Sequence, residues 1–179
     1  MKIVLATHNK DKCLEMMDVL SNLNIELLTL HEFPHIGEII EDGATLKDNA
    51  LIKARSVHEL TKLPSLADDT GLEVEALGGA PGVFSARYSG ENASYSDNVN
   101  KLLKDMQNVP NGKRMAKFRT VMAFIDDKME LIVEGCVEGI ITDVTKGVDG
   151  FGYDPVFYVP EMNKTYAEMS IKEKNQISH

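Results

Sequence analysis

The sequence has few of the features that mark secreted, membrane-spanning or disulfide-rich proteins. It contains two cysteines, Cys13 and Cys136, among 179 residues. In a reducing compartment the expected state of such a pair is two small thiols and not a disulfide. No apolar stretch reaches the length of a membrane span, and the N-terminus lacks the apolar core of a secretion signal. These absences predict a cytoplasmic protein with no membrane partner.

A zinc site and broad nucleic-acid binding are also disfavoured. The sequence has 28 acidic against 19 basic side chains and a formal net charge of −9, which opposes binding to polyanions, although a local cationic cleft can still hold a phosphorylated ligand. We therefore expect no nucleic acid as a partner. None of the histidines has a Cys or His partner at the short intervals of zinc sites, and they are His8, His31, His35, His58 and His179.

The chain is predicted to be a single domain, 1–179. Its length is usual for one domain, its 43% of hydrophobic residues can furnish a core, and no low-complexity linker divides it. Hydrophobic periodicity predicts helices and strands that mix without strict alternation. The expected fold class is α/β, with a long mixed β-sheet flanked by helices and split into two lobes. The expected strands are 2–7, 25–28, 116–125 and 130–137, and the expected helices are 12–23, 46–61, 94–106 and a last segment that opens at 165–168.

The segment with the clearest chemical signal is an apolar run that ends in two adjacent carboxylates. Asp68 and Asp69 follow Leu66 and Ala67, so we expect them where a strand ends, which is where open α/β sheets place ligands. Neighbouring carboxylates repel each other unless a cation or a shared proton offsets the charge, and hard oxygen ligands suit Mg²⁺ or Mn²⁺. A plain turn is an equally good interpretation, because Asp and Gly are common turn formers.

A phosphate site is a second candidate, at the start of the chain. Thr7, Asn9 and Lys12 lie where the first strand leads into a helix. The N-terminus of a helix presents unpaired N–H groups and the positive end of the helix dipole. A hydroxyl, an amide and an ammonium beside them would suit a polyphosphate. As a motif this spacing is weak, since it lacks the glycines of a P-loop and a solvated lysine at a helix start is ordinary.

Two further groups of residues have both a functional and an ordinary interpretation. Asn49 and Lys53 are one turn apart on the predicted helix 46–61, so they share a face and could meet one ligand. A solvated polar stripe is the more common outcome. Glycines at 147, 150 and 152 precede the segment 153–157. Flexible backbone beside an aromatic ring and a carboxylate suits a base pocket, but a strand entry after a glycine turn fits as well.

Taken together, these segments carry a family resemblance across the whole chain, from Lys2 to His179. In their order and spacing they are similar to the inosine triphosphate pyrophosphatases, which remove aberrant purine nucleoside triphosphates. The matching blocks are 7–12, 41–43, 49–53, 67–72, 82–87, 151–155 and 178–179. The resemblance implies a two-lobed fold with a central nucleotide cleft and a homodimer. It implies hydrolysis of ITP, dITP and XTP to the nucleoside monophosphate and pyrophosphate, with Mg²⁺ or Mn²⁺ as cofactor.

The resemblance also implies roles for individual residues. Asp69 would be the catalytic proton acceptor and a metal ligand, with Glu41 and Asp68 as further metal ligands. The residues that would hold the phosphates are Thr7, Asn9, Lys12, Lys53 and Thr70. The residues that would contact the base are Phe151, Gly152, Tyr153, Asp154, Lys174 and His179.

One departure from the family pattern concerns the C-terminal block. In the family a Ser-His-Arg block contacts the base and a terminal helix follows, whereas this sequence stops at His179. We therefore expect the domain to lack the usual C-terminal helix, with weaker base selectivity and lower stability.

Two other classes of protein are alternatives. A haloacid-dehalogenase-type phosphohydrolase would form an aspartyl-phosphate, but its nucleophile motif has a residue between the two aspartates, which Asp68 and Asp69 lack. A non-catalytic nucleotide-binding or sensor protein would bind ITP with Mg²⁺ and release no pyrophosphate.

Overall fold

The computed structural model describes residues 1–177, and the chain divides into two compact units. The first unit comprises Met1–Asp69 and Thr120–Glu134, and the second comprises Thr70–Arg119 and Gly135–His179. The strands are β1 (Lys2–Leu5), β2 (Glu26–Thr29), β3 (Ser65–Val74), β4 (Pro81–Gly82), β5 (Met115–Ile125), β6 (Glu130–Ile141), β7 (Phe157–Val159) and β8 (Lys164–Thr165). The α-helices are α1 (Lys10–Val19), α2 (Leu46–Thr61), α3 (Tyr95–Asp105) and α4 (Ile171–Ile177).

Within the described residues the strands form one eight-stranded sheet. Its order is β2-β1-β3-β5-β6-β7-β8, with β4 paired to β3. The pairs β1–β2 and β1–β3 are parallel, whereas β3–β4, β6–β7 and β7–β8 are antiparallel. The mixed sheet with flanking helices that the sequence predicted is therefore confirmed. In residues 1–177 no helix has the length and apolar character needed to cross a membrane, and both cysteines are free thiols.

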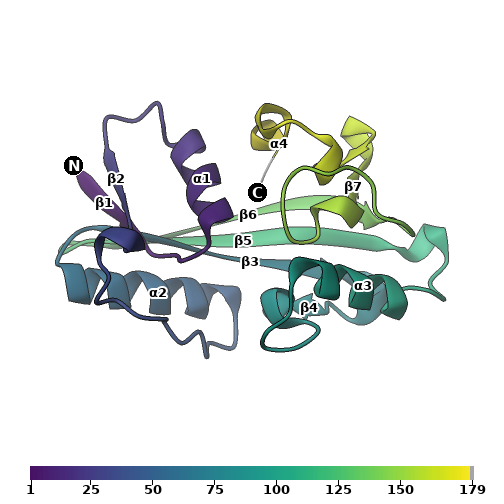
Figure 1. Ribbon diagram of the computed structural model, residues 1–179, viewed down its shortest axis with the longest axis horizontal. Helices are drawn as coiled ribbons and strands as arrows, with labels where there is room; N and C mark the ends of the chain where they lie inside the picture. Colours follow the sequence, from purple (N-terminus) through teal and green to yellow (C-terminus); the bar gives the residue numbers. More distant parts are fainter. Residues whose placement is uncertain (178–179) are drawn as a thin grey trace. The chain divides into compact units, whose positions relative to one another are not determined.

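The first unit begins with the predicted β-α-β segment. Each residue of β1 pairs with one of β2, from Lys2 with Glu26 to Leu5 with Thr29. In this unit α1 and α2 lie on opposite faces of the sheet (Figure 1). The apolar residues of β1 from Ile3 to Leu5 are buried, because a strand covered on both faces needs apolar side chains on each.

Helix α2 has the bounds that the sequence predicted. The hydroxyl oxygen of Thr45 accepts a hydrogen bond from the backbone N–H of Asp48 at 3.1 Å, which caps the first turn. The apolar stripe Leu46, Ala50, Ala54 and Val57 is buried. Asn49 and Lys53 are buried beside that stripe, so the solvated polar stripe considered for them is wrong.

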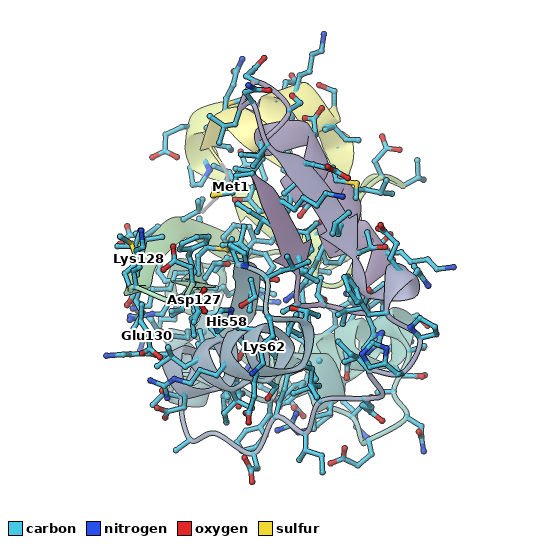
Figure 2. All side chains as sticks on the ribbon, turned by 90° about the vertical axis from the view of Figure 1, so that its left-hand side faces the viewer. Met1, His58, Lys62, Asp127, Lys128 and Glu130 are labelled. Atoms are coloured by element: carbon cyan, nitrogen blue, oxygen red, sulfur yellow. The ribbon has the colours of Figure 1, made fainter. Side chains whose placement is uncertain are left out.

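Charged groups connect α2 to the hairpin between β5 and β6. The guanidinium of Arg55 donates two hydrogen bonds to the carboxylate of Glu130, at 2.8 and 2.7 Å. His58 Nε2 lies 3.4 Å from Asp127 Oδ1 at the hairpin turn, and Figure 2 shows the two side chains next to each other. Such exposed pairs contribute little stability, but they show that the helix that carries Lys53 lies beside the hairpin.

The second unit is built around an aromatic core. The rings of Phe118 and Tyr166 are stacked with centroids 5.8 Å apart, and Phe157 lies 4.6 Å from Phe118. Leu72 and Leu102 complete this buried cluster with other apolar residues of β3 and α3. In this unit α3 lies on one side of the strands and α4 on the other (Figure 1).

One prediction about the acidic segment is wrong. Asp68 and Asp69 do not end a strand, since β3 continues through them from Ser65 to Val74. The ladder with β1 pairs Leu5 with Leu66, and farther along β3 the short strand β4 pairs with Leu72. The aspartates thus lie between these two pairings, and the plain turn is excluded.

Other boundaries also differ from the prediction. Strand β6 extends to Ile141 and not to 137, because Ile140 and Ile141 pair with β7. Thr165 forms a capping box with Glu168, where the last helical segment was expected to open, but the box caps a single 3₁₀ turn. The helix α4 begins separately at Ile171. The first helix starts at Lys10 and ends at Val19, where the carbonyl of Asp18 accepts hydrogen bonds from the next turn and closes the helix.

Candidate active site

Two carboxylates of the first unit share one ammonium group. Lys53 Nζ lies 2.6 Å from Glu41 Oε2 and 3.2 Å from Asp69 Oδ1. Asn49, one turn before Lys53 on α2, donates from Nδ2 to Asp69 Oδ2 at 3.2 Å. Asp69 is 9% exposed. Its carboxylate accepts from an amide on one oxygen and pairs with an ammonium on the other. A loop, a helix and a strand therefore meet at the ammonium of Lys53.

The neighbouring aspartate has a different partner. Lys12 Nζ donates to Asp68 Oδ2 at 2.6 Å. Lys12 lies in the first turn of α1, which Asn9 caps by accepting hydrogen bonds from the N–H groups of Asp11 and Lys12. The hydroxyl oxygen of Thr7 accepts from the N–H of Asn9 at 3.1 Å. Thr7 and Asn9 therefore shape the turn between β1 and α1 and hold Lys12 beside Asp68.

Burial and charge act against each other at this centre. Burial raises the pKa of Asp69, while the ammonium groups of Lys53 and Lys12 oppose that rise and Glu41 adds to it. Burial by itself would lower the pKa of Lys12, but Asp68, Asp69 and Glu41 together raise it above its ordinary value. Lys12 thus keeps its positive charge, and Asp69 binds a proton more readily than an exposed aspartate does.

The donor set of this centre fits a Mg²⁺ ion that arrives with phosphates. Within residues 1–177 no group of three or more His, Cys, Asp or Glu side chains is arranged as a complete metal site. Glu41 and Asp69 nevertheless place carboxylate oxygens around a single cation, the ammonium of Lys53. Mg²⁺ in proteins is typically held by one or two carboxylates together with substrate phosphates and water. Two carboxylates therefore suffice for such an ion.

A second cluster of the predicted residues lies in the second unit. Lys174 Nζ donates to Asp154 Oδ2 at 2.7 Å, and both residues are buried. The backbone N–H of Phe151 donates to the same carboxylate oxygen at 3.0 Å. The ammonium of Lys174 also lies 4.9 Å from the centroid of the Phe151 ring and 5.2 Å from that of Tyr166. An aromatic face, an ammonium and a carboxylate are thus combined in one small region.

A glycine makes this arrangement possible. Gly150 has φ +74°, and a Cβ atom at this position would lie 2.1 Å from Asp154 Oδ2. Both the left-handed backbone and the close approach favour glycine over a larger residue. The need for glycine at position 150 is therefore explained by its backbone conformation and by the close approach of Asp154.

The sequence did not reveal that Ser85 is a buried hydrogen-bonding residue in the second unit. The Tyr153 hydroxyl donates to the carbonyl oxygen of Ser85 at 2.9 Å. The Ser85 hydroxyl donates to the Gly82 carbonyl at 2.6 Å and accepts from the N–H of Leu72 at 2.8 Å. Burial, with a smaller effect from Tyr88, raises the pKa of Tyr153, so the phenol stays protonated and remains a donor. The only signal in the sequence was membership of the block 82–87, which does not reveal a buried serine.

The structure brings together most of the predicted site residues within each unit. In the first unit the predicted metal and phosphate residues form the two ion-paired groups around Lys12 and Lys53. Thr70 follows Asp69 on β3 and is the first residue of the second unit. His179 lies outside the described residues. The predicted base residues in the second unit are Phe151, Gly152, Tyr153, Asp154 and Lys174. The backbone N–H of Phe151 and the ammonium of Lys174 both donate to Asp154, whereas the Tyr153 hydroxyl donates to Ser85.

The fold and the site together define an α/β protein with a buried carboxylate–lysine centre. Comparison with known proteins gives a narrower assignment. The model of the Ham1 family matches residues 3–179, and the chain belongs to this family. The predicted family resemblance is therefore confirmed.

Proteins similar to this chain match it over nearly its full length. A protein of Caldanaerobacter subterraneus named dITP/XTP pyrophosphatase is 47% identical over 100% of this chain and 90% of its own length. A Vibrio cholerae protein of the same name is 48% identical over 99% of this chain and 90% of its own length. Among solved structures, a HAM1 protein from Coxiella burnetii is 43% identical with a TM-score of 0.90 and covers 100% of this chain and 92% of the other. The Staphylococcus aureus Ham1 protein gives a TM-score of 0.88 at 37% identity, with the same coverage.

Proposed function

We propose that this protein hydrolyses aberrant purine nucleoside triphosphates, namely dITP, XTP and ITP, to the nucleoside monophosphate and pyrophosphate, and so cleans the nucleotide pool. The observation that carries the proposal is the pair Glu41 and Asp69 on the single ammonium of Lys53. The names of the relatives support the same substrate class, since full-length homologues at nearly half identity are called dITP/XTP pyrophosphatases.

In the proposed reaction a water molecule attacks the α-phosphorus. Asp69 accepts one proton from the water as the new P–O bond forms. The bond between the α-phosphorus and the oxygen that bridges to the β-phosphate breaks, and pyrophosphate leaves with its electron pair. A raised pKa suits Asp69 to this role, because a general base works best when its pKa approaches the working pH. Phosphoryl transfer depends mainly on positioning and charge stabilisation, so no covalent nucleophile is needed.

Glu41 and Asp69 would hold the metal ion, with Asp68 beside them. When bound, Mg²⁺ neutralises the triphosphate and aligns it for attack, and Mn²⁺ can supply the same chemistry. Lys12 and Lys53 would bind phosphate oxygens, with Thr7, Asn9 and Thr70 as polar neighbours. Each lysine already has a carboxylate partner, so phosphate binding exchanges one anionic partner for another, and the metal ion would offset the charge of the carboxylates that the lysines leave.

The second cluster would recognise the base. Phe151 offers a ring for stacking, and Lys174 is a donor that suits the 6-oxo acceptor of hypoxanthine and xanthine. Adenine carries a 6-amino donor there, so the ammonium would face another donor. Sites that hydrogen-bond one edge of a ligand can favour the right ligand over the wrong one by roughly 10⁴-fold, because the wrong ligand leaves a buried polar group unpaired.

Product analysis in ¹⁸O-labelled water tests the proposal. The purified protein is incubated with Mg²⁺ and a panel of dITP, XTP, ITP, dATP and dGTP, and the products are separated by chromatography. We expect pyrophosphate as the leaving product from the first three, with ¹⁸O in the monophosphate. Label in pyrophosphate would place the attack on the β-phosphorus.

The same experiment separates the alternative classes. Release of orthophosphate with a trapped aspartyl adduct would indicate the dehalogenase-type reaction. Binding of ITP with Mg²⁺ and no release of pyrophosphate would indicate a sensor. A homodimer and a cytoplasmic location stay predictions, and light scattering coupled to size-exclusion chromatography would test the first.

A further inference from the structure

Asn49 uses both ends of its side-chain amide inside the first unit. It is only 1% exposed. Its Nδ2 donates to Asp69 Oδ2 at 3.2 Å, and its Oδ1 accepts from the backbone N–H of Gly43 at 2.8 Å. Gly43 lies two residues after Glu41 in the same loop. One side chain therefore connects the carboxylate on β3 to the loop that carries the other carboxylate.

The contact at Gly43 depends on a very close approach. A Cβ atom at Gly43 would lie 2.6 Å from Asn49 Oδ1 and 2.7 Å from the Cβ atom of Asp48. Real Cβ atoms do not approach other atoms so closely, and the neighbours belong to the start of a well-packed helix. Glycine is thus required here for space, and any other residue would push the loop away from Asn49.

The two donors on Asp69 together restrict its carboxylate. An ammonium group such as that of Lys53 accepts many orientations of a carboxylate, because its three donors rotate freely. Asn49 adds a directional donor on the second oxygen. With one donor on each oxygen, the carboxylate group cannot rotate without losing a buried hydrogen bond.

We propose that Asn49 is a positioning residue that locks Asp69 and the Glu41 loop into one unit and contacts neither substrate nor metal. This inference rests on the proposed function for its kinetic consequences. The hydrogen bond between Asn49 and Gly43, which anchors the loop, can be tested without any measurement of activity. The inference replaces the expectation that Asn49 meets a ligand together with Lys53.

A matched control exists in the second unit. Asn98 is also a buried asparagine on a helix, at 3% exposure. Its Oδ1 accepts from the backbone N–H of Ser89 at 2.8 Å, and its Nδ2 donates to the carbonyl oxygen of Ala86 at 3.0 Å. Asn98→Ala therefore removes these two hydrogen bonds and a third, from the Ser89 hydroxyl to Asn98 Oδ1 at 3.1 Å, without touching Asp69.

The test compares Asn49→Ala, Asn49→Asp and Asn98→Ala in steady-state turnover of dITP, thermal melting and amide hydrogen exchange. Both alanine variants should lower the melting temperature to a similar extent. Asn49→Ala should reduce kcat by roughly 10- to 100-fold with KM changed less than about threefold, since a misplaced catalytic group costs rate more than binding. Asn98→Ala should keep kcat within about threefold.

The aspartate variant separates the two ends of Asn49. Asn49→Asp keeps an oxygen to accept from Gly43 but removes the donor to Asp69. We expect the Gly43 amide to exchange faster in Asn49→Ala and to stay protected in Asn49→Asp, while kcat falls in both.

Several results would overturn the inference. An equal loss of kcat in Asn49→Ala and Asn98→Ala would make Asn49 merely structural. A raised KM with unchanged kcat would place Asn49 on the ligand. Unchanged protection of Gly43 in Asn49→Ala would disprove the link to the loop. If the unmodified protein releases no pyrophosphate, the proposed function fails, and hydrogen exchange at Gly43 still decides whether Asn49 anchors the loop.

Discussion

Lys12 Nζ lies 2.6 Å from Asp68 Oδ2, although the two residues are 56 positions apart in the chain. This pair makes the adjacent aspartates chemically unequal. Asp68 has its own ammonium partner, whereas Asp69 shares Lys53 with Glu41. Burial raises the pKa of Asp69, which suits this carboxylate to accept a proton.

Replacing each aspartate by asparagine should therefore give unequal losses. Asp69→Asn should lower turnover of dITP by on the order of a hundredfold or more with little change in KM, since the base acts mainly in the transition state. Asp68→Asn should lower it less, by about tenfold, because Asp69 keeps its charge. Steady-state kinetics on both variants measure the difference. Unchanged turnover in Asp69→Asn would move the base to Asp68 or Glu41.

Lys12→Ala should weaken binding of ITP and ATP alike, because its ammonium is assigned to phosphates, which the two ligands share. The ratio of the two dissociation constants should stay nearly constant, and Lys53→Ala should behave in the same way. Isothermal titration with each nucleotide, in the presence of Ca²⁺ to slow turnover, measures both constants. A strong change in the ratio would place that lysine at the base.

Lys174→Met should reduce the preference for dITP over dATP. The variant removes the proposed donor to the 6-oxo group and leaves Asp154, which is 3% exposed, without its ammonium. Loss of one partner of a buried ion pair costs about 3–5 kcal/mol of stability. Ratios of kcat/KM and a denaturant melt measure the two effects. Lys164→Met is the matched control, since its pair with Glu173 is more exposed, and it should leave the preference unchanged.

Gly150→Ala should destabilise the protein more than Gly78→Ala. Both positions have positive φ, +74° and +65°, which costs a residue with a Cβ about 1–2 kcal/mol. At Gly78 nothing lies within 4 Å of an added Cβ, whereas at Gly150 Asp154 Oδ2 would be 2.1 Å away. Urea unfolding of both variants gives the comparison. Equal losses would mean that Asp154 moves aside without cost.

Glu173 should make a pH-dependent contribution to stability. Hydrogen bonds from Lys164 and from the backbone and hydroxyl of Ser170 lower its pKa to about 2. A lowered pKa in the folded state means that the contribution is present above the ordinary value of about 4.5 and is lost as the pH falls towards 2. The difference in melting temperature between the unmodified protein and Glu173→Gln should thus shrink below about pH 4.5. A difference that is constant from pH 7 to pH 3 would contradict this.

Local patterns predicted the elements whose signals lie close together in the sequence. The bounds of α2 follow from the hydroxyl of Thr45 at its start and from an apolar stripe that repeats every turn. The turn between the predicted strands 116–125 and 130–137 was equally local, since the side chain of Asp126 accepts from the N–H groups of Lys128 and Met129. Strand ends were predicted less well, because the extent of β6 depends on pairing with β7, which lies far along the chain.

The sequence by itself determined the fold class, the family and the residue types of the candidate site. Those depend on hydrophobic periodicity and on the order of short motifs, which are properties of the linear chain. Tertiary structure alone decided that β3 runs through Asp68 and Asp69, that Lys12 pairs with the first of them, and that Asn49 joins the second to Gly43. The physical reason is that a buried polar group must find a partner wherever packing places one, and packing brings together residues whose separation in the sequence carries no signal.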